Sequence, residues 1–125
     1  MRNALLVALG GALGSVLRWL VGSAVHTLMP TSTFPWGTLG INLAGSFAIG
    51  LVMALALERT LVPPAARLFL VTGVLGGFTT FSALSYETLQ LVRDGEWPAA
   101  AGYVLGSLTG GVAAAFGGFA LASRL

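Results

Sequence analysis

Long apolar stretches, separated by short segments rich in proline, arginine and acidic residues, constrain this chain most strongly. A helix needs about 20 mainly apolar residues to cross the hydrocarbon core of a bilayer. The sequence offers four such stretches, at about residues 3–28, 36–57, 66–92 and 98–123. Only 8% of its residues are charged, whereas a soluble domain carries about a quarter. We therefore predict a single all-α membrane domain over residues 1–125, with four transmembrane helices.

The first stretch resembles a signal peptide at its start, because Arg2 precedes an apolar run. Arg18 interrupts that run and no convincing cleavage site follows, so we predict a retained first span. Gly10 and Gly14 are four residues apart and share a face suited to close helix contact. Arg18 is costly deep in lipid. It either extends to the nearer interface or lines a water-filled vestibule, and we favour the vestibule because intramembrane charge commonly marks function.

Polar residues recur every four positions in the second stretch, at Thr38, Asn42 and Ser46. This spacing places them on one face of a helix. They could bond neighbouring helices, at about 0.6 kcal/mol each, or line a polar pathway. The amide of Asn42 needs several partners in mid-span, which favours the lining.

The third stretch contains adjacent glycines, Gly76 and Gly77, close to adjacent threonines, Thr79 and Thr80. Glycine in a helix interior costs about 1 kcal/mol relative to alanine. Threonine hydroxyls can pair with backbone groups that a distorted helix leaves open. One interpretation is a helix broken near its middle, which membranes tolerate only inside protein or beside a cavity. The other is a patch of small residues for close helix packing.

Two stripes run along the fourth stretch. The first consists of glycines at four-residue spacing, which predicts close helix packing: Gly102, Gly106 and Gly110. The second consists of Tyr103 and Ser107 and would continue to Gly111. A mid-span tyrosine hydroxyl needs a polar partner, so packing and pathway lining both remain open for this stripe.

Several functional classes are excluded by the sequence. There is no cysteine and a single histidine, His26, which excludes metal sites built from these residues. The acidic residues lie at span ends, so we predict neither an enzyme nor a proton-coupled exporter. A net charge of +2 does not suggest a nucleic-acid surface. What remains is a set of uncharged hydrogen-bond donors, which could partly dehydrate a small anion and still release it.

The loops carry a weak charge bias. The chain ends and the loop between the second and third spans share one side, with Arg2, Arg59, Arg67 and Arg124, whereas Arg93 lies on the other. The bias favours the first side as cytoplasmic. So small a bias is also compatible with insertion in both orientations.

Three stretches together resemble a known family: GGALGSVLRW at Gly10–Trp19, PWGTLGINLAGSFAIG at Pro35–Gly50 and GVLGGFTTFSALSYE at Gly73–Glu87. The chain resembles the Fluc/CrcB fluoride channels over its whole length. The third stretch is close to a signature of that family.

The resemblance implies an antiparallel, dual-topology homodimer of four-span subunits in the inner or plasma membrane, with the third helix broken. Two pores along the subunit interface would export cytoplasmic fluoride passively and relieve its toxicity. The implied partners are fluoride, lipid and a second, inverted copy of the chain. A structural Na⁺ at the interface would be held by the backbone carbonyls of Gly76 and Thr79 from both subunits.

The resemblance also assigns residues to the fluoride pathway. Asn42 matches the family's pore asparagine and Phe81 the first phenylalanine of its aromatic box. The polar track of the fourth span matches Tyr103 and Ser107. The full predicted set is Arg18, Thr38, Asn42, Ser46, Phe81, Ser82, Leu84, Glu87, Tyr103 and Ser107.

Two positions depart from the family pattern. Leu84 stands where the second box phenylalanine would be, and Gly111 stands where the polar track often has a hydroxyl. Leucine fills the volume but lacks the positive edge of an aromatic ring. An alternative is therefore a non-conducting or half-pore subunit of a heterodimeric fluoride channel. A small multidrug-type antiporter is a weaker alternative, because the first span lacks a mid-span glutamate.

Overall fold

The computed structural model describes all residues from Met1 to Leu125. Three spans are continuous helices: α1 (Arg2–Leu28), α2 (Trp36–Leu57) and α6 (Trp97–Ser123). The third span is assembled from four pieces, namely α3 (Pro64–Arg67), the π-helix η1 (Leu68–Leu75), α4 (Gly76–Phe78) and α5 (Phe81–Arg93). All four spans are long and apolar enough to cross a membrane. The four-helix prediction is confirmed, and the predicted boundaries lie within two residues of those observed.

The third span is broken at its middle, as one of the two interpretations predicts. Thr79 (φ −82°, ψ 156°) and Thr80 (φ −152°, ψ 117°) have extended backbone between α4 and α5. The packing interpretation also holds for Gly77, because a Cβ there would overlap the backbone of Gly11 on α1. The sequence GGFTT thus both packs against α1 and interrupts the helix.

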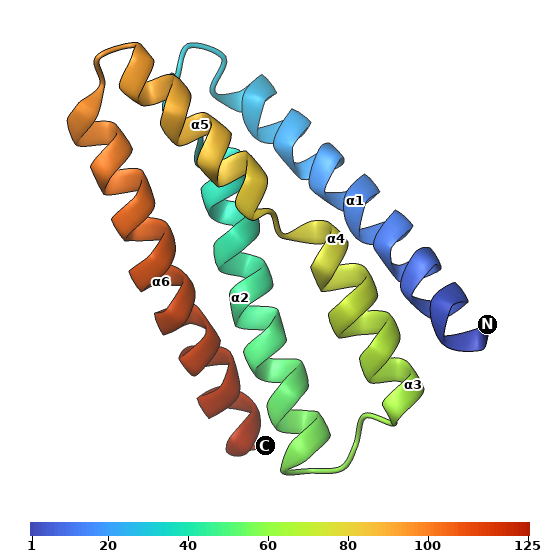
Figure 1. Ribbon diagram of the computed structural model, residues 1–125. Helices are drawn as coiled ribbons and strands as arrows, with labels where there is room; N and C mark the ends of the chain where they lie inside the picture. The colour runs from blue at the N-terminus through green and yellow to red at the C-terminus, as the bar shows by residue number, and fades with distance from the viewer.

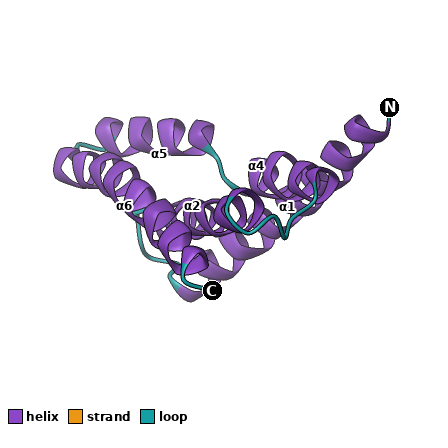
Figure 2. Ribbon diagram, turned by 90° about the horizontal axis from the view of Figure 1, so that it is seen from below, coloured by secondary structure: helices purple, strands orange, loops and turns teal.

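The break transfers the third span from one neighbour to another. Before it, η1 and α4 pack along α1; after it, α5 packs on α6 (Figure 1). The view along the bundle in Figure 2 shows α4 beside α1 and α5 beside α6, with the extended linker crossing between them. The α2 helix packs chiefly on α6. The break therefore lies at the centre of the bundle, next to α2.

Close contact between α1 and the third span depends on two glycines. A Cβ on Gly10 would approach the carbonyl oxygen of Phe69, and one on Gly14 would overlap the carbonyl oxygen of Val74. Both glycines are buried. The prediction that Gly10 and Gly14 form a close-packing face is confirmed.

Close packing of α6 on α2 involves one of the three predicted glycines, because a Cβ on Gly110 would lie 3.0 Å from Leu43 Cδ2. A Cβ on Gly102 or Gly106 would meet nothing within 4 Å, so neither glycine makes a tight contact between helices of one chain. The tightest contacts with α2, which involve backbone atoms, lie further along α6. There a Cβ on Gly118 would overlap the carbonyl oxygen of Phe47, and a Cβ on Gly50 of α2 would overlap that of Ala115. The four-residue spacing alone could not identify which face of α6 meets α2.

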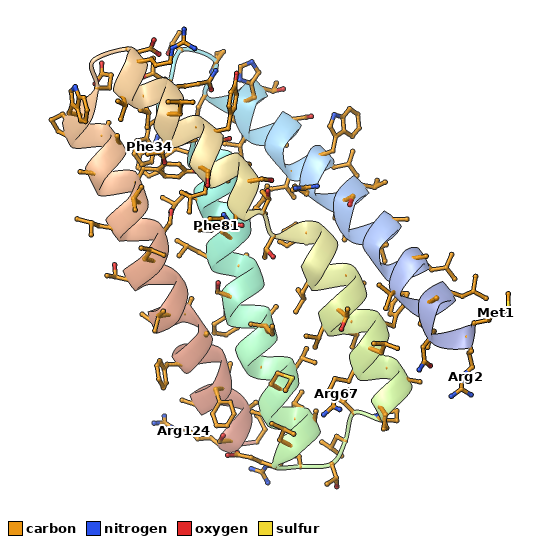
Figure 3. The ribbon with its side chains drawn as sticks, in the orientation of Figure 1. Met1, Arg2, Phe34, Arg67, Phe81 and Arg124 are labelled. Carbon is orange, nitrogen blue, oxygen red and sulfur yellow. The ribbon has the colours of Figure 1, made fainter.

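Most arginines lie at one end of the bundle. Figure 3 places Arg2, Arg67 and Arg124 at the end that also holds the chain termini and the loop between α2 and α3. At this end Arg59 donates from Nη2 to the carbonyl of Ser123 at 2.8 Å, which joins the end of α2 to the end of α6. The predicted grouping of the basic residues is therefore present in the fold.

Candidate functional site

A groove of about 370 Å³ opens on the bundle beside the break in the third span. We call it the central groove. Its wall is contributed by α2, the third span and α6, and it is apolar apart from a band of polar groups at the level of the break. Seven residues of the predicted site line it, namely Asn42, Ser46, Gly76, Thr79, Phe81, Leu84 and Ser107.

Asn42 of α2 is bonded to the backbone of the break at two points. Its Oδ1 accepts from the Thr80 N–H at 2.8 Å, and its Nδ2 donates to the Thr80 carbonyl at 3.1 Å. The methyl group of Thr79 packs against Gly45, where a Cβ would overlap it. The α2 helix thus contacts both residues of the break, and one side chain occupies both backbone hydrogen-bonding groups of Thr80.

These bonds leave two carbonyls without their helical partners. In a continuous helix the Gly76 carbonyl would accept from the Thr80 N–H and the Thr79 carbonyl from the Ala83 N–H. Here Thr80 donates to Asn42, and Ala83 donates to Thr80 Oγ1 at 3.1 Å in an N-cap of α5. Carbonyl oxygens released from a helix are suitable ligands for a cation such as Na⁺. The carbonyl oxygens of Gly76 and Thr79 are therefore chemically suited to the predicted role of cation ligands.

A second polar cluster lies nearer the end of the bundle. Glu87 of α5 accepts from Thr38 Oγ1 at 2.8 Å and from the Tyr103 hydroxyl at 2.5 Å. Tyr103 is fully buried, and its ring meets Phe34 edge-on with centroids 5.5 Å apart. The three side chains come from α2, α5 and α6, so this cluster fastens the second half of the third span to its neighbours.

Removing one bond of this cluster should weaken the fold measurably. We expect Tyr103→Phe to lower the free energy of unfolding by about 1.5–3 kcal/mol, because the half-buried carboxylate of Glu87 loses a hydrogen-bond donor. Reversible unfolding in detergent measures the change. Tyr86→Phe is the matched control, since Tyr86 is 61% exposed and should change stability little. Equal stability of the two variants would argue against a stabilising role for the cluster.

Ser107 lies between the two polar groups along α6. Its Oγ is buried, lines the central groove and has no hydrogen-bond partner. A buried hydroxyl left unpaired costs about 1–3 kcal/mol, so Ser107 has an unused donor beside the groove. Further along α6, a Cβ on Gly111 would lie 3.4 Å from Ser46 Oγ. The stripe predicted on α6 therefore faces the polar residues of α2.

Two residues of the signature differ sharply in their surroundings. Phe81, the first residue of α5, is 75% exposed and lines the central groove. In Figure 3, Phe81 lies nearer the middle of the bundle than Phe34 does. Leu84 is 7% exposed and packs with Tyr103, Leu91 and Ala100. Its side chain thus belongs to the core of the chain as much as to the groove.

Comparison with known proteins decides the family. A family model described as "CrcB-like protein, Camphor Resistance (CrcB)" matches residues 5–119. The chain belongs to the CrcB family. It is 54% identical to a protein of Thermus thermophilus over 100% of this chain and 98% of the relative, and 53% identical to one of Chlorobaculum tepidum over 98% and 95%. A protein of Agrobacterium fabrum is 50% identical over 100% and 99%. All three relatives are named fluoride-specific ion channel FluC.

This CrcB-family fold does not bring every predicted residue into the two polar groups. Arg18 is half-buried on α1 and is not among the residues that line the central groove or bond Glu87. Ser82 is exposed on the first turn of α5, with its Oγ 3.2 Å from Thr80 Oγ1. Assignment to the fluoride pathway stays a prediction for these two residues, as it does for the rest of the predicted set.

Sequence reasoning did not foresee the contacts that three residues make at the site. Thr80 caps α5, donates its N–H to Asn42 Oδ1 and accepts from Asn42 Nδ2. Gly45 makes room for Thr79, and Phe34 packs on Tyr103. A threonine directly before a helix start is a recognisable N-cap, so the role of Thr80 had a signal. The contact of the loop residue Phe34 depends on tertiary packing and had none.

Proposed function

We propose that this chain conducts fluoride passively across the membrane and thereby lowers cytoplasmic fluoride. The observation that carries the proposal is a groove of uncharged hydrogen-bond donors beside a broken span, in a chain about half identical to proteins named fluoride-specific ion channels. Donors without fixed charge dehydrate a small anion partly and still let it leave. The ring edge of Phe81 carries partial positive charge and is accessible from the groove.

A second copy of the chain, in inverted orientation, would cover the central groove. Irregular backbone at membrane depth is tolerated only inside protein or beside water, yet Gly76 and Phe81 are exposed here. A homodimer would enclose the break and place two grooves along its interface. The bias of basic residues between the two ends is small enough to be compatible with insertion in both orientations.

The same dimer would bring the Gly76 and Thr79 carbonyls of two chains together. We propose that these oxygens hold a structural Na⁺ at the interface. Support comes from the diverted amide partners of both carbonyls and from the oxygen ligands that hard cations prefer. The bound ion would supply positive charge that holds the two broken spans together.

Efflux from liposomes that contain only this purified chain tests the function. We expect rapid fluoride release measured with a fluoride electrode, while a parallel chloride electrode records retention. Release of both halides would contradict selectivity. No fluoride release from folded protein would show that the chain does not conduct alone.

A second candidate is a half-pore subunit that needs a non-identical partner. Leu84 and Gly111 favour it, since each lacks a group that the family pattern supplies. Leu84 is also packed into the core beside Tyr103 rather than exposed like Phe81. Fluoride release by the single purified chain would exclude this candidate.

The exposed ring of Phe81 provides a direct test of anion contact. We expect Phe81→Ile to lower fluoride efflux at least tenfold, because isoleucine keeps an apolar side chain but has no positive ring edge. Phe116→Ile is the matched control. Phe116 of α6 is 72% exposed, close to the 75% of Phe81, but lies on a wholly apolar surface with Val112 and Phe119. Equal rates in both variants would reduce Phe81 to a packing role.

A further inference from the structure

Most hydrogen-bonding groups of the Asn42 side chain are bonded to the backbone of the same chain. An asparagine side chain has two N–H donors and one carbonyl acceptor. Its Oδ1 accepts from the Thr80 N–H at 2.8 Å, and one Nδ2 hydrogen goes to the Thr80 carbonyl at 3.1 Å. One N–H remains for the central groove that Asn42 lines. The side chain therefore pairs with Thr80 much as a neighbouring strand would.

The bond to the Thr80 N–H competes directly with helix formation. If Thr79 and Thr80 became helical, the Thr80 N–H would return to the Gly76 carbonyl. An unsatisfied backbone group in the membrane costs several kcal/mol. With Asn42 present, the N–H is satisfied outside the helix, so this penalty no longer favours an unbroken span.

We infer that Asn42 is the positioning residue that keeps the third span broken, and that it does so by holding Thr80 in an extended conformation. Thr80 then completes the effect by capping α5 through Oγ1, which draws the Ala83 N–H away from the Thr79 carbonyl. Asn42 thus releases the Gly76 carbonyl directly and the Thr79 carbonyl indirectly, through the position in which it holds Thr80. Their use as ligands rests on the proposed function, whereas the dependence of the break on Asn42 does not.

The competing explanation is that GGFTT breaks the helix unaided. Gly76 and Gly77 weaken helix formation by about 1 kcal/mol each relative to alanine. The methyl group of Thr79 also packs against Gly45, which has no side chain in the way. In that case Asn42 would simply pair with a break that already exists. The two explanations differ in what happens when Asn42 is removed.

NMR of threonine-labelled protein in detergent micelles separates them. In the unmodified chain the Cα and Cβ shifts of Thr79 and Thr80 should be those of extended backbone. In Asn42→Leu, which keeps the size of the side chain, we expect both to change to helical values. Thr88 and Thr109, inside α5 and α6, report whether the rest of the fold is unchanged.

Ser46→Ala is the matched control, because Ser46 is one turn further along α2 and lines the same groove without a bond to the break. Extended shifts at Thr79 and Thr80 in folded Asn42→Leu would overturn the inference. If Asn42→Leu does not fold, Asn42→Ala gives the same comparison with a smaller side chain. The NMR measurement needs neither fluoride nor efflux. If the unmodified chain did not conduct fluoride, the proposed function would be wrong, but the NMR result would still decide whether Asn42 maintains the break.

Discussion

Asn42→Asp is expected to lower fluoride efflux about a thousand-fold while the protein stays folded. The substitution preserves the size of the side chain and its acceptor toward the Thr80 N–H. It introduces a negative charge into the wall of the central groove. A unit charge about 4 Å from a permeating anion costs about 4 kcal/mol at an effective dielectric constant of about 20. That energy corresponds to about a thousand-fold lower occupancy.

The same change also removes a bond of the break. Aspartate cannot donate to the Thr80 carbonyl, which Nδ2 of Asn42 reaches at 3.1 Å. Two oxygen atoms would then face each other. The charge and the lost bond act in the same direction on conduction, so the effect should exceed that of replacing Phe81.

Liposome efflux beside a mass measurement of the detergent-solubilised protein tests this prediction. Asn3→Asp is the matched control, because Asn3 is the chain's only other asparagine and is exposed at the start of α1. The control should conduct normally. Undiminished efflux in Asn42→Asp would remove Asn42 from the pathway, and an altered mass would show that the substitution acts on assembly.

The architecture was predictable because membrane spans follow from composition over long windows. Four apolar stretches of adequate length fix four helices whatever their mutual contacts. The break was also detectable, since glycines and threonines adjoin in mid-span at Gly76–Thr80. Sequence alone left it level with a packing patch, and the structure shows that Gly77 packs while Thr79 and Thr80 break the helix.

The sequence alone could not predict which face of each helix packs against which neighbouring helix. The glycines at positions 102 and 106 have ideal spacing but face open space, whereas Gly50 and Gly118 form the contact between α2 and α6. Periodicity identifies a face of one helix and says nothing about which helix, if any, will meet it. Asn42 shows the same limit, because its pairing with Thr80 joins residues 38 positions apart.

Gly14→Val is expected to prevent stable folding. A Cβ at this position would overlap the carbonyl oxygen of Val74 and approach the backbone N of Phe78 to 2.8 Å. Both are backbone atoms of the third span, so no side-chain rotation relieves the overlap and α1 itself must move. Overpacking of this kind typically costs about 1–3 kcal/mol for added methylenes, and occasionally more. A branched side chain against rigid backbone lies at the upper end of that range.

The expected loss reaches the site as well as the fold. Residues before the break pack on α1 through η1 and α4, so displacement of α1 removes the support behind Gly76. We expect Gly14→Val to give little monodisperse protein in detergent and early thermal unfolding. Gly11→Val is the control on the same helix, since a Cβ at Gly11 meets nothing within 4 Å. Because valine is also a better helix former than glycine, the control should fold at least as well as the unmodified chain. Equal loss in both variants would mean that α1 tolerates no side chain on this side, and that the contact with Val74 has no special role.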